Sequence, residues 1–219
     1  MLLALTIIGL PSFTPYLHAA DPATITFSLD FPTSDPEHYS ISVESNGHAK
    51  YECSVKISPD SEDREKYETE FTLSDATRSR IFDLAEHAHY FDGKIDSGNK
   101  KLAFTGAKKL TYKDPQHDAT AAYNYSQQPA VQELTRLFQG LDATLEFGRR
   151  ISHYHRYQKL ALDEELKRME NQAQGGGLAE IQAAQSVLQD VYDDPSVINV
   201  VRARAQRIIE LGKAEAAKR

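Results

Sequence analysis

Hydrophobic and polar residues alternate along three stretches near the start of the chain, at residues 25–31, 39–43 and 51–57. A period of two places every second side chain on one side of an extended backbone, so each stretch is expected to be a half-buried β-strand. A shorter alternation at residues 67–71 predicts a fourth strand. Cys53 falls on the hydrophobic side of its stretch, which indicates a small core residue and not a reactive thiol.

The register of the second and third strands follows from which residues must face the core. A two-residue Asn46-Gly47 turn would place Val43 opposite Lys50, a hydrophobic residue opposite a polar one. A three-residue loop over residues 45–47 avoids this conflict, with Gly47 in the left-handed conformation of a bulged hairpin. That loop pairs the inward residues with one another: Val43 with Ala49, Ile41 with Tyr51 and Tyr39 with Cys53.

A helix and further strands follow the fourth strand. Ser74 is a typical N-cap residue, and hydrophobic residues at helical spacing between Ile81 and Ala88 predict a helix. Further strands are expected at residues 102–104, 110–112 and 123–125. Because the turns between successive strands are short, the pattern favours an antiparallel sheet with one helix laid across it.

The hydrophobic period becomes helical after Tyr125. Pro129 suits the first position of a helix, and five hydrophobic residues then share one helical face: Val131, Leu134, Phe138, Leu141 and Leu145. This face needs an apolar partner, so the first part of the helix is expected to pack on the sheet. The stripe turns polar at Gly148, which predicts a kink or a change of neighbour. Gly175–Gly177 predicts a break before two more helices.

These patterns predict an α+β fold in which an antiparallel sheet with one helix across it precedes a C-terminal all-helical region. The predicted boundaries are a signal peptide at 1–20, a sheet domain with packed helices at 21–147, a connecting helix at 148–174 and a helical hairpin at 178–219.

The first twenty residues resemble a secretory signal peptide. Leu2–Leu10 form an apolar run that ends at Pro11, although the Lys or Arg that usually precedes such a run is missing. A buried N-terminal strand is the alternative interpretation. Ala19 and Ala20 are the small residues expected before a cleavage site. The run is about half of the ~20 residues that span a bilayer. We therefore expect export to the periplasm or the outside of the cell, with no membrane span in the mature chain.

Charge and cysteine content narrow the expected partners. The chain has a formal net charge of −7, and residues 21–127 account for it with 19 acidic and 12 basic residues. The negative charge argues against nucleic acid as a partner and leaves another protein as the expected kind. The single cysteine, Cys53, leaves the fold dependent on its hydrophobic core. The sequence indicates no cofactor and leaves the oligomeric state open.

Three features together carry a resemblance: the leader, the Asn46-Gly47 hairpin before a helix capped by Ser74, and the terminal helical hairpin. In these the chain is similar to exported bacterial proteins that have no assigned function, and the resemblance implies no catalytic residues. The segment DDPSVINVVRARAQ (residues 193–206) also resembles the second helix of a HEAT-type repeat, but as a single unit with stretched spacing. A solenoid needs several stacked units, so a helical hairpin is expected.

Two histidine pairs are candidate metal ligands. The segment HAHYFD contains His87, His89 and Asp92, close to the HxHxD signature of metallo-hydrolases, but its acid is one position late. If this segment is extended, its alternate histidines point to the same side and can share an ion. His153 and His155 lie on a predicted helix, where residues two apart point in nearly opposite directions, so they cannot.

A basic and aromatic stretch follows Gly148. Its candidate binding surface consists of Arg149, Arg150, Tyr154, Arg156, Tyr157 and Lys159. Charged residues at i,i+4 spacing, among them Glu146 with Arg150, favour an ordinary solvated helix face. Docking onto the acidic sheet domain and binding of a polyanion are the second and third interpretations.

Known catalytic motifs leave no trace: GxSxG, HExxH, CxxC and a phosphate-binding glycine loop are all absent from the sequence. The leading hypothesis is an exported, non-catalytic protein that binds another protein or serves the cell envelope. The alternative is an exported hydrolase, which could depend on a metal and would use scattered His, Asp and Glu residues. A carboxylate pair of the glycosidase kind remains open, because distant acids can meet in space.

Overall fold

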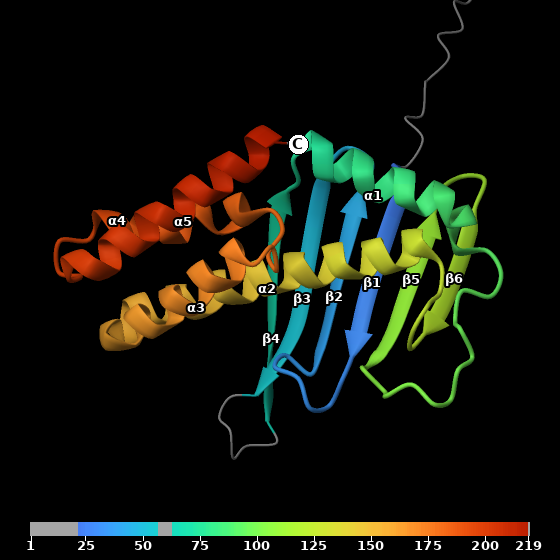
Figure 1. Cartoon of the computed structure of the whole chain (residues 1–219), viewed down its shortest axis with the longest axis horizontal. Coiled ribbons are helices and arrows are strands. Elements are labelled where there is room, and N and C mark those ends of the chain that lie inside the picture. Colours follow the sequence, from blue (N-terminus) through green and yellow to red (C-terminus); the bar gives the residue numbers. More distant parts are fainter. Residues whose placement is uncertain (1–21, 57–62, 219) are drawn as a thin grey trace, which may run out of the picture.

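A computed structural model describes residues 22–56 and 63–218 of the chain. The fold is α+β, with a six-stranded antiparallel sheet followed by a C-terminal helical region (Figure 1). The strands lie in the order β4-β3-β2-β1-β5-β6. They are β1 (Thr24–Asp30), β2 (His38–Glu44), β3 (His48–Lys56), β4 (Arg64–Thr72), β5 (Ala107–Lys113) and β6 (Asp118–Tyr123). The signal peptide predicted at residues 1–20 lies outside the described residues.

The β2–β3 hairpin has the predicted register. Val43 pairs with Ala49, Ile41 with Tyr51 and Tyr39 with Cys53, and all six side chains are buried. Gly47 adopts a φ of 93°, a conformation that favours glycine. Keeping each inward residue opposite another inward residue therefore determined the loop length, as expected from the period of two.

Two helices cover the same face of the sheet (Figure 1). Helix α1 (Asp75–His87) begins at Ser74, whose hydroxyl accepts a hydrogen bond from the amide of Thr77. Helix α2 (Pro129–Tyr157) crosses the strands, and its predicted stripe from Val131 to Leu145 is buried in the core of the sheet. Phe138 stacks on Phe27 of β1 with 5.2 Å between ring centroids. The prediction that α2 packs on the sheet is confirmed.

The outward side chains of the sheet are small or charged. Thr26 and Ser42 share a hydrogen bond of 2.9 Å across β1 and β2, and Thr111 and Thr120 share one of 3.0 Å across β5 and β6. Lys50, next along the sheet, pairs with Glu52 and Glu68. An antiparallel sheet with one packed and one polar face explains the strict alternation in the sequence.

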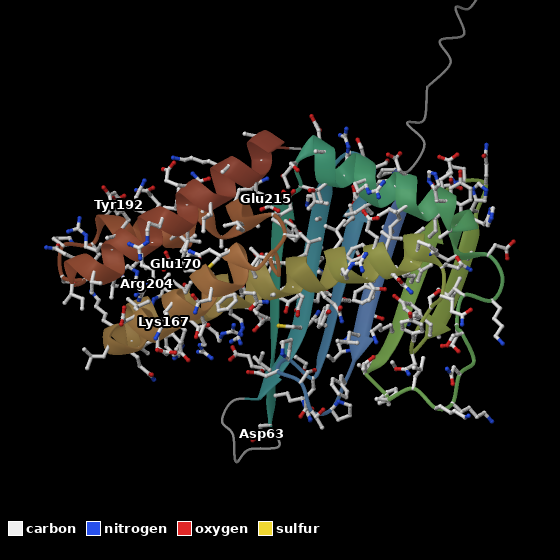
Figure 2. All side chains as sticks on the ribbon, in the orientation of Figure 1. Asp63, Lys167, Glu170, Tyr192, Arg204 and Glu215 are labelled. Atoms are coloured by element: carbon white, nitrogen blue, oxygen red, sulfur yellow. The ribbon has the colours of Figure 1, made fainter. Side chains whose placement is uncertain are left out.

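The C-terminal helices build a second hydrophobic core. They are α3 (Leu162–Gln174), the short 3-10 helix η3 (Ile181–Ala184), α4 (Gln185–Asp193) and α5 (Asn199–Lys218). Phe147 and Ile151 of α2 belong to this second core together with Leu166, Leu188 and Ile208. Where α3 and α5 meet, Arg204 donates to Glu170 over 3.1 Å (Figure 2). Helix α2 therefore serves one core up to Leu145 and the other from Phe147 onward.

One local prediction was wrong, and one of the two alternatives predicted at Gly148 was found. Residues 102–104 form no strand: Leu102 and Phe104 are exposed in the loop before β5, because two alternating positions do not provide a face that the sheet can bury. Helix α2 runs through Gly148 and ends only at Tyr157, before Gln158, whose φ of −146° is not helical. The hydrophobic stripe becomes polar at Gly148 because the helix changes its packing partner there, and not because the helix breaks. The connecting helix expected at 148–174 is thus the end of α2 plus α3.

In the described parts of the chain, every helix is too short or too polar to cross a bilayer.

The segment between α3 and η3 joins the two cores. The amide of Ala179 donates to the carbonyl of Gly140 on α2, and the hydroxyl of Thr144 donates to the carbonyl of Ala179 over 2.7 Å. A side chain at Gly140 would lie 3.2 Å from Ala179, so glycine permits this close contact.

Glu180 completes the joint. This residue is 2% exposed, and its φ of 53° directs the chain into η3. The carboxylate accepts hydrogen bonds from the amide of Ser74 over 3.0 Å, from the hydroxyl of Ser74 over 2.6 Å, and from the hydroxyl of Thr77. A negative charge at the N-terminus of α1 is favourable, because unpaired amides and the helix dipole are positive there.

We expect the double variant Leu134→Ala, Leu141→Ala to lose much of the stability of the sheet domain. Both leucines are fully buried in its core, and each substitution should cost ~2–5 kcal/mol. Urea unfolding followed by circular dichroism measures the change. Arg136→Ala, at an exposed site on the same helix, should change the free energy of unfolding by less than ~0.5 kcal/mol. An unchanged urea midpoint in the double variant would show that α2 is not part of this core.

We expect Glu180→Gln to destabilise the protein by ~1–3 kcal/mol, because it removes a buried charge from the N-terminus of α1 and turns an amide donor toward other donors. The matched control is Glu210→Gln, which changes an exposed acid paired with Lys213 and should cost little. Equal urea midpoints for the two variants would contradict a special role for Glu180.

Candidate functional site

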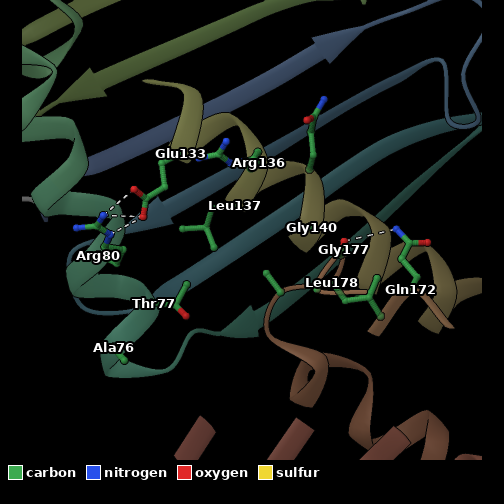
Figure 3. Close-up of a pocket in the computed structure, with 13 residues that line it drawn as sticks. Ala76, Thr77, Arg80, Glu133, Arg136, Leu137, Gly140, Gln172, Gly177 and Leu178 are labelled. Atoms are coloured by element: carbon green, nitrogen blue, oxygen red, sulfur yellow. Dashed lines mark hydrogen bonds and ion pairs between the residues drawn. The ribbon is translucent and has the colours of Figure 1, made fainter. Parts of the chain in front are cut away.

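A groove lies beside the joint, between α1, α2 and the Gly176–Ala179 segment (Figure 3). Its volume is about 700 Å³, within the range of ~300–1,000 Å³ that ligand sites occupy. Leu137, Leu178 and Ala179 provide apolar surface along it. The groove therefore exists because the chain returns to the sheet domain after α3 without filling the space next to α1.

Charged residues form one end of the groove. The guanidinium of Arg80 on α1 donates to the carboxylate of Glu133 on α2, with distances of 2.7 and 2.6 Å (Figure 3). Thr77, deeper in the groove, donates to Glu180. Arg80 and Glu133 bind one another, whereas Arg136, which also lines the groove, adds a positive charge beside the apolar surface.

A buried polar network lies on the opposite flank of α2. The hydroxyl of Tyr51 is 2.9 Å from the Asp142 carboxylate and 2.8 Å from that of Glu146, and the thiol of Cys53 is 3.4 Å from Glu146. Burial raises the pKa of Asp142 to about 7, although the hydrogen bond from Tyr51 acts in the opposite direction. Cys53 is 2% exposed and thus a core residue as predicted, and this burial raises the pKa of its thiol to about 12.

Two arginines of the predicted basic surface neutralise buried acids. Arg149 donates to Glu146 over 2.7 Å, and Arg150 donates to Glu165 of α3 over 2.6 Å. The side chains of Glu146 and Glu165 are 3% and 0% exposed. A buried carboxylate needs such a partner, because removal from water is costly for an unpaired charge. The second interpretation had expected these arginines to contact the acidic sheet domain. Their partners lie instead on α2 and α3.

The rest of that surface is divided. Lys159 pairs with Asp194 over 2.6 Å, and His155 contacts the same carboxylate over 2.9 Å, so the end of α2 is attached to the α4–α5 turn. Tyr154 packs against the second core. Arg156 and Tyr157 are exposed, with the guanidinium 5.9 Å from the ring. The six predicted residues therefore do not form one continuous free surface.

The predicted metal ligands do not converge. His87 ends α1 and its Nδ1 lies 2.6 Å from the carbonyl of Asp83, while His89 and Asp92 are exposed in the next turn. His89, Tyr90 and Phe91 have φ values of 50°, 54° and 65°, so the segment is a left-handed turn and not the extended strand that alternate ligands require. Within the described ranges, His, Cys, Asp and Glu form no group of three that could hold a metal.

The groove was not predicted from the sequence. Its residues come from three segments, and the local signals were only an arginine near the start of α1 and glycines after α3. The sequence matches no protein-family model and no curated protein sequence.

The raised pKa of Asp142 predicts a pH dependence of stability. The folded protein holds this proton more tightly than the unfolded chain, so stability should fall as pH rises from about 4 to about 7. Asp142→Asn cannot ionise, so at pH 8 its free energy of unfolding should exceed that of the wild type by ~1–3 kcal/mol. Near pH 4 the two free energies should become equal. Urea unfolding at several pH values tests this. Glu146→Gln, which leaves Arg149 unpaired, should instead destabilise, and a pH-independent effect of Asp142→Asn would refute the assignment.

Proposed function

We propose that this protein is exported, is not an enzyme, and binds a segment of another protein in the groove between α1 and α2. The single observation that carries the proposal is the groove itself, with an apolar floor at Leu137 and Leu178 and a polar end where Arg80 and Glu133 form an ion pair. An apolar floor can bind apolar side chains, and the polar groups beside it can bind main-chain amides and carbonyls. A peptide segment offers both.

The shape of the groove also supports a chain as the ligand. Its lining on α2 extends from Glu133 to Gly140, about 10 Å along the helix. At the Gly176–Gly177 end, a β-carbon added to Gly176 would meet nothing within 4 Å, so the backbone there is open to an approaching main chain. A segment of several residues fits this length.

Export rests on the leader at residues 1–20, and a periplasmic or extracellular location would supply a partner of the cell envelope. The mature protein, by this proposal, presents the groove through rigid helices whose positions are set by the two cores. A site on packed helices loses little freedom when it binds.

The test uses a peptide library displayed on phage and selected against the purified protein. Ala76→Trp places an indole in the groove, whereas Ser79→Trp places one on an exposed position of the same helix that does not line it. Peptides rich in apolar residues should be enriched, should bind the wild type and Ser79→Trp equally, and should lose about ten-fold or more in affinity for Ala76→Trp. Enriched peptides that bind Ala76→Trp as well as the wild type, or no enrichment at all, would refute the proposal.

A further inference from the structure

A second cavity, of about 420 Å³, lies on the other flank of α2, between that helix and the ends of β5 and β6. Lys108, Tyr123, Tyr125, Ser126 and Arg136 are among the residues that line it. Two of its lining residues are basic and, of the described residues that line it, none is acidic. In a chain of net charge −7, this makes the cavity a local exception.

Lys108 supplies the deep positive charge. It is 4% exposed, and its ammonium contacts the carbonyl and the hydroxyl of Thr105, both at 2.9 Å, and the carbonyls of Asn124 at 3.1 Å and Gly106 at 3.4 Å. All of these oxygens are neutral, in contrast to the carboxylates that accompany Arg149 and Arg150. Burial lowers the pKa of Lys108, which is the sign of a charge that its surroundings do not compensate.

Donors for an oxyanion lie around the same cavity. The hydroxyl of Tyr125 accepts from the Gln132 amide over 2.9 Å, and that of Ser126 accepts from the amide of Gln128 over 3.2 Å, so each hydroxyl proton can point elsewhere. Arg136 stands on the exposed ridge of α2, and its planar guanidinium suits a carboxylate or a phosphate.

We propose that this cavity binds a small organic anion, whose carboxylate or phosphate is held by Arg136 and by the hydroxyls of Tyr125 and Ser126 and is attracted by the buried charge of Lys108. The rings of Tyr123 and Tyr125 contact the apolar body of the ligand. The volume fits a small molecule. This inference does not depend on a ligand in the groove. The groove lies on the other side of the α2 ridge, and Arg136 on that ridge lines both the groove and the cavity.

Isothermal titration of the full-length protein with benzoate and with phenyl phosphate tests the proposal, with benzamide as the neutral analogue. We expect at least one of the two anions to bind, benzamide to bind at least about ten-fold more weakly, and Lys108→Met and Arg136→Gln each to weaken the anion by about ten-fold or more. Arg80→Gln is the matched control, because Arg80 lines the groove and not this cavity. It should leave anion binding unchanged.

A structural role of Lys108 alone is distinguished by a second measurement. Nuclear magnetic resonance of the labelled lysine side chains should show the pKa of Lys108 rising when the anion is added, since an anion stabilises the ammonium form. Absence of binding by both anions, equal binding of benzamide, full affinity in Lys108→Met or Arg136→Gln, or an unchanged pKa of Lys108 would each overturn the proposal. The peptide selection on the Ala76→Trp variant remains an independent test of the groove.

Discussion

The contact between Glu180 and the N-terminus of α1 is the interaction on which the arrangement of the whole molecule depends. A buried carboxylate is costly unless donors surround it, and here the amide of Ser74 and the hydroxyls of Ser74 and Thr77 supply them. The same contact satisfies the amide of Ser74, one of those that a helix leaves unpaired at its start. It holds the chain after α3 against the sheet domain, and the groove is the space that this return leaves open.

Helix α2 carries the second constraint, because it contributes to both cores. Its stripe up to Leu145 faces the sheet, and from Phe147 it faces α3, α4 and η3. The two ends of one flank then differ in their chemistry. On one flank Glu146 is neutralised by Arg149, whereas at the other end of the same flank Lys108 faces the helix with only neutral oxygens around it. A buried charge with a partner of opposite sign is tolerated in a packed core, whereas one among neutral groups still attracts an ion of opposite sign.

Much of the fold was predictable because its signals are local. The period of two established the strands, and the need to place Val43 opposite Ala49 determined the loop of the β2–β3 hairpin. The helical stripe that begins at Val131 required an apolar partner, and only the sheet lay within reach of so short a linker. Where a pattern was two residues long, as at Leu102 and Phe104, it had no predictive value, since a single pair of alternating residues occurs in loops as well as in strands.

By itself, the sequence determined the fold class, the register of the β2–β3 hairpin and the core position of Cys53, because each depends on spacing along the chain. Only the tertiary structure decided which charges are compensated. Arg150 makes the i,i+4 contact with Glu146 that the sequence predicts, but it also pairs with Glu165 of another helix, and Lys108 is buried with only neutral oxygens as hydrogen-bond partners. The pairing of Glu180 with the start of α1 spans 106 residues. Electrostatic contacts of this kind depend on distance in space and on removal from water, and neither is encoded in the local order of residues.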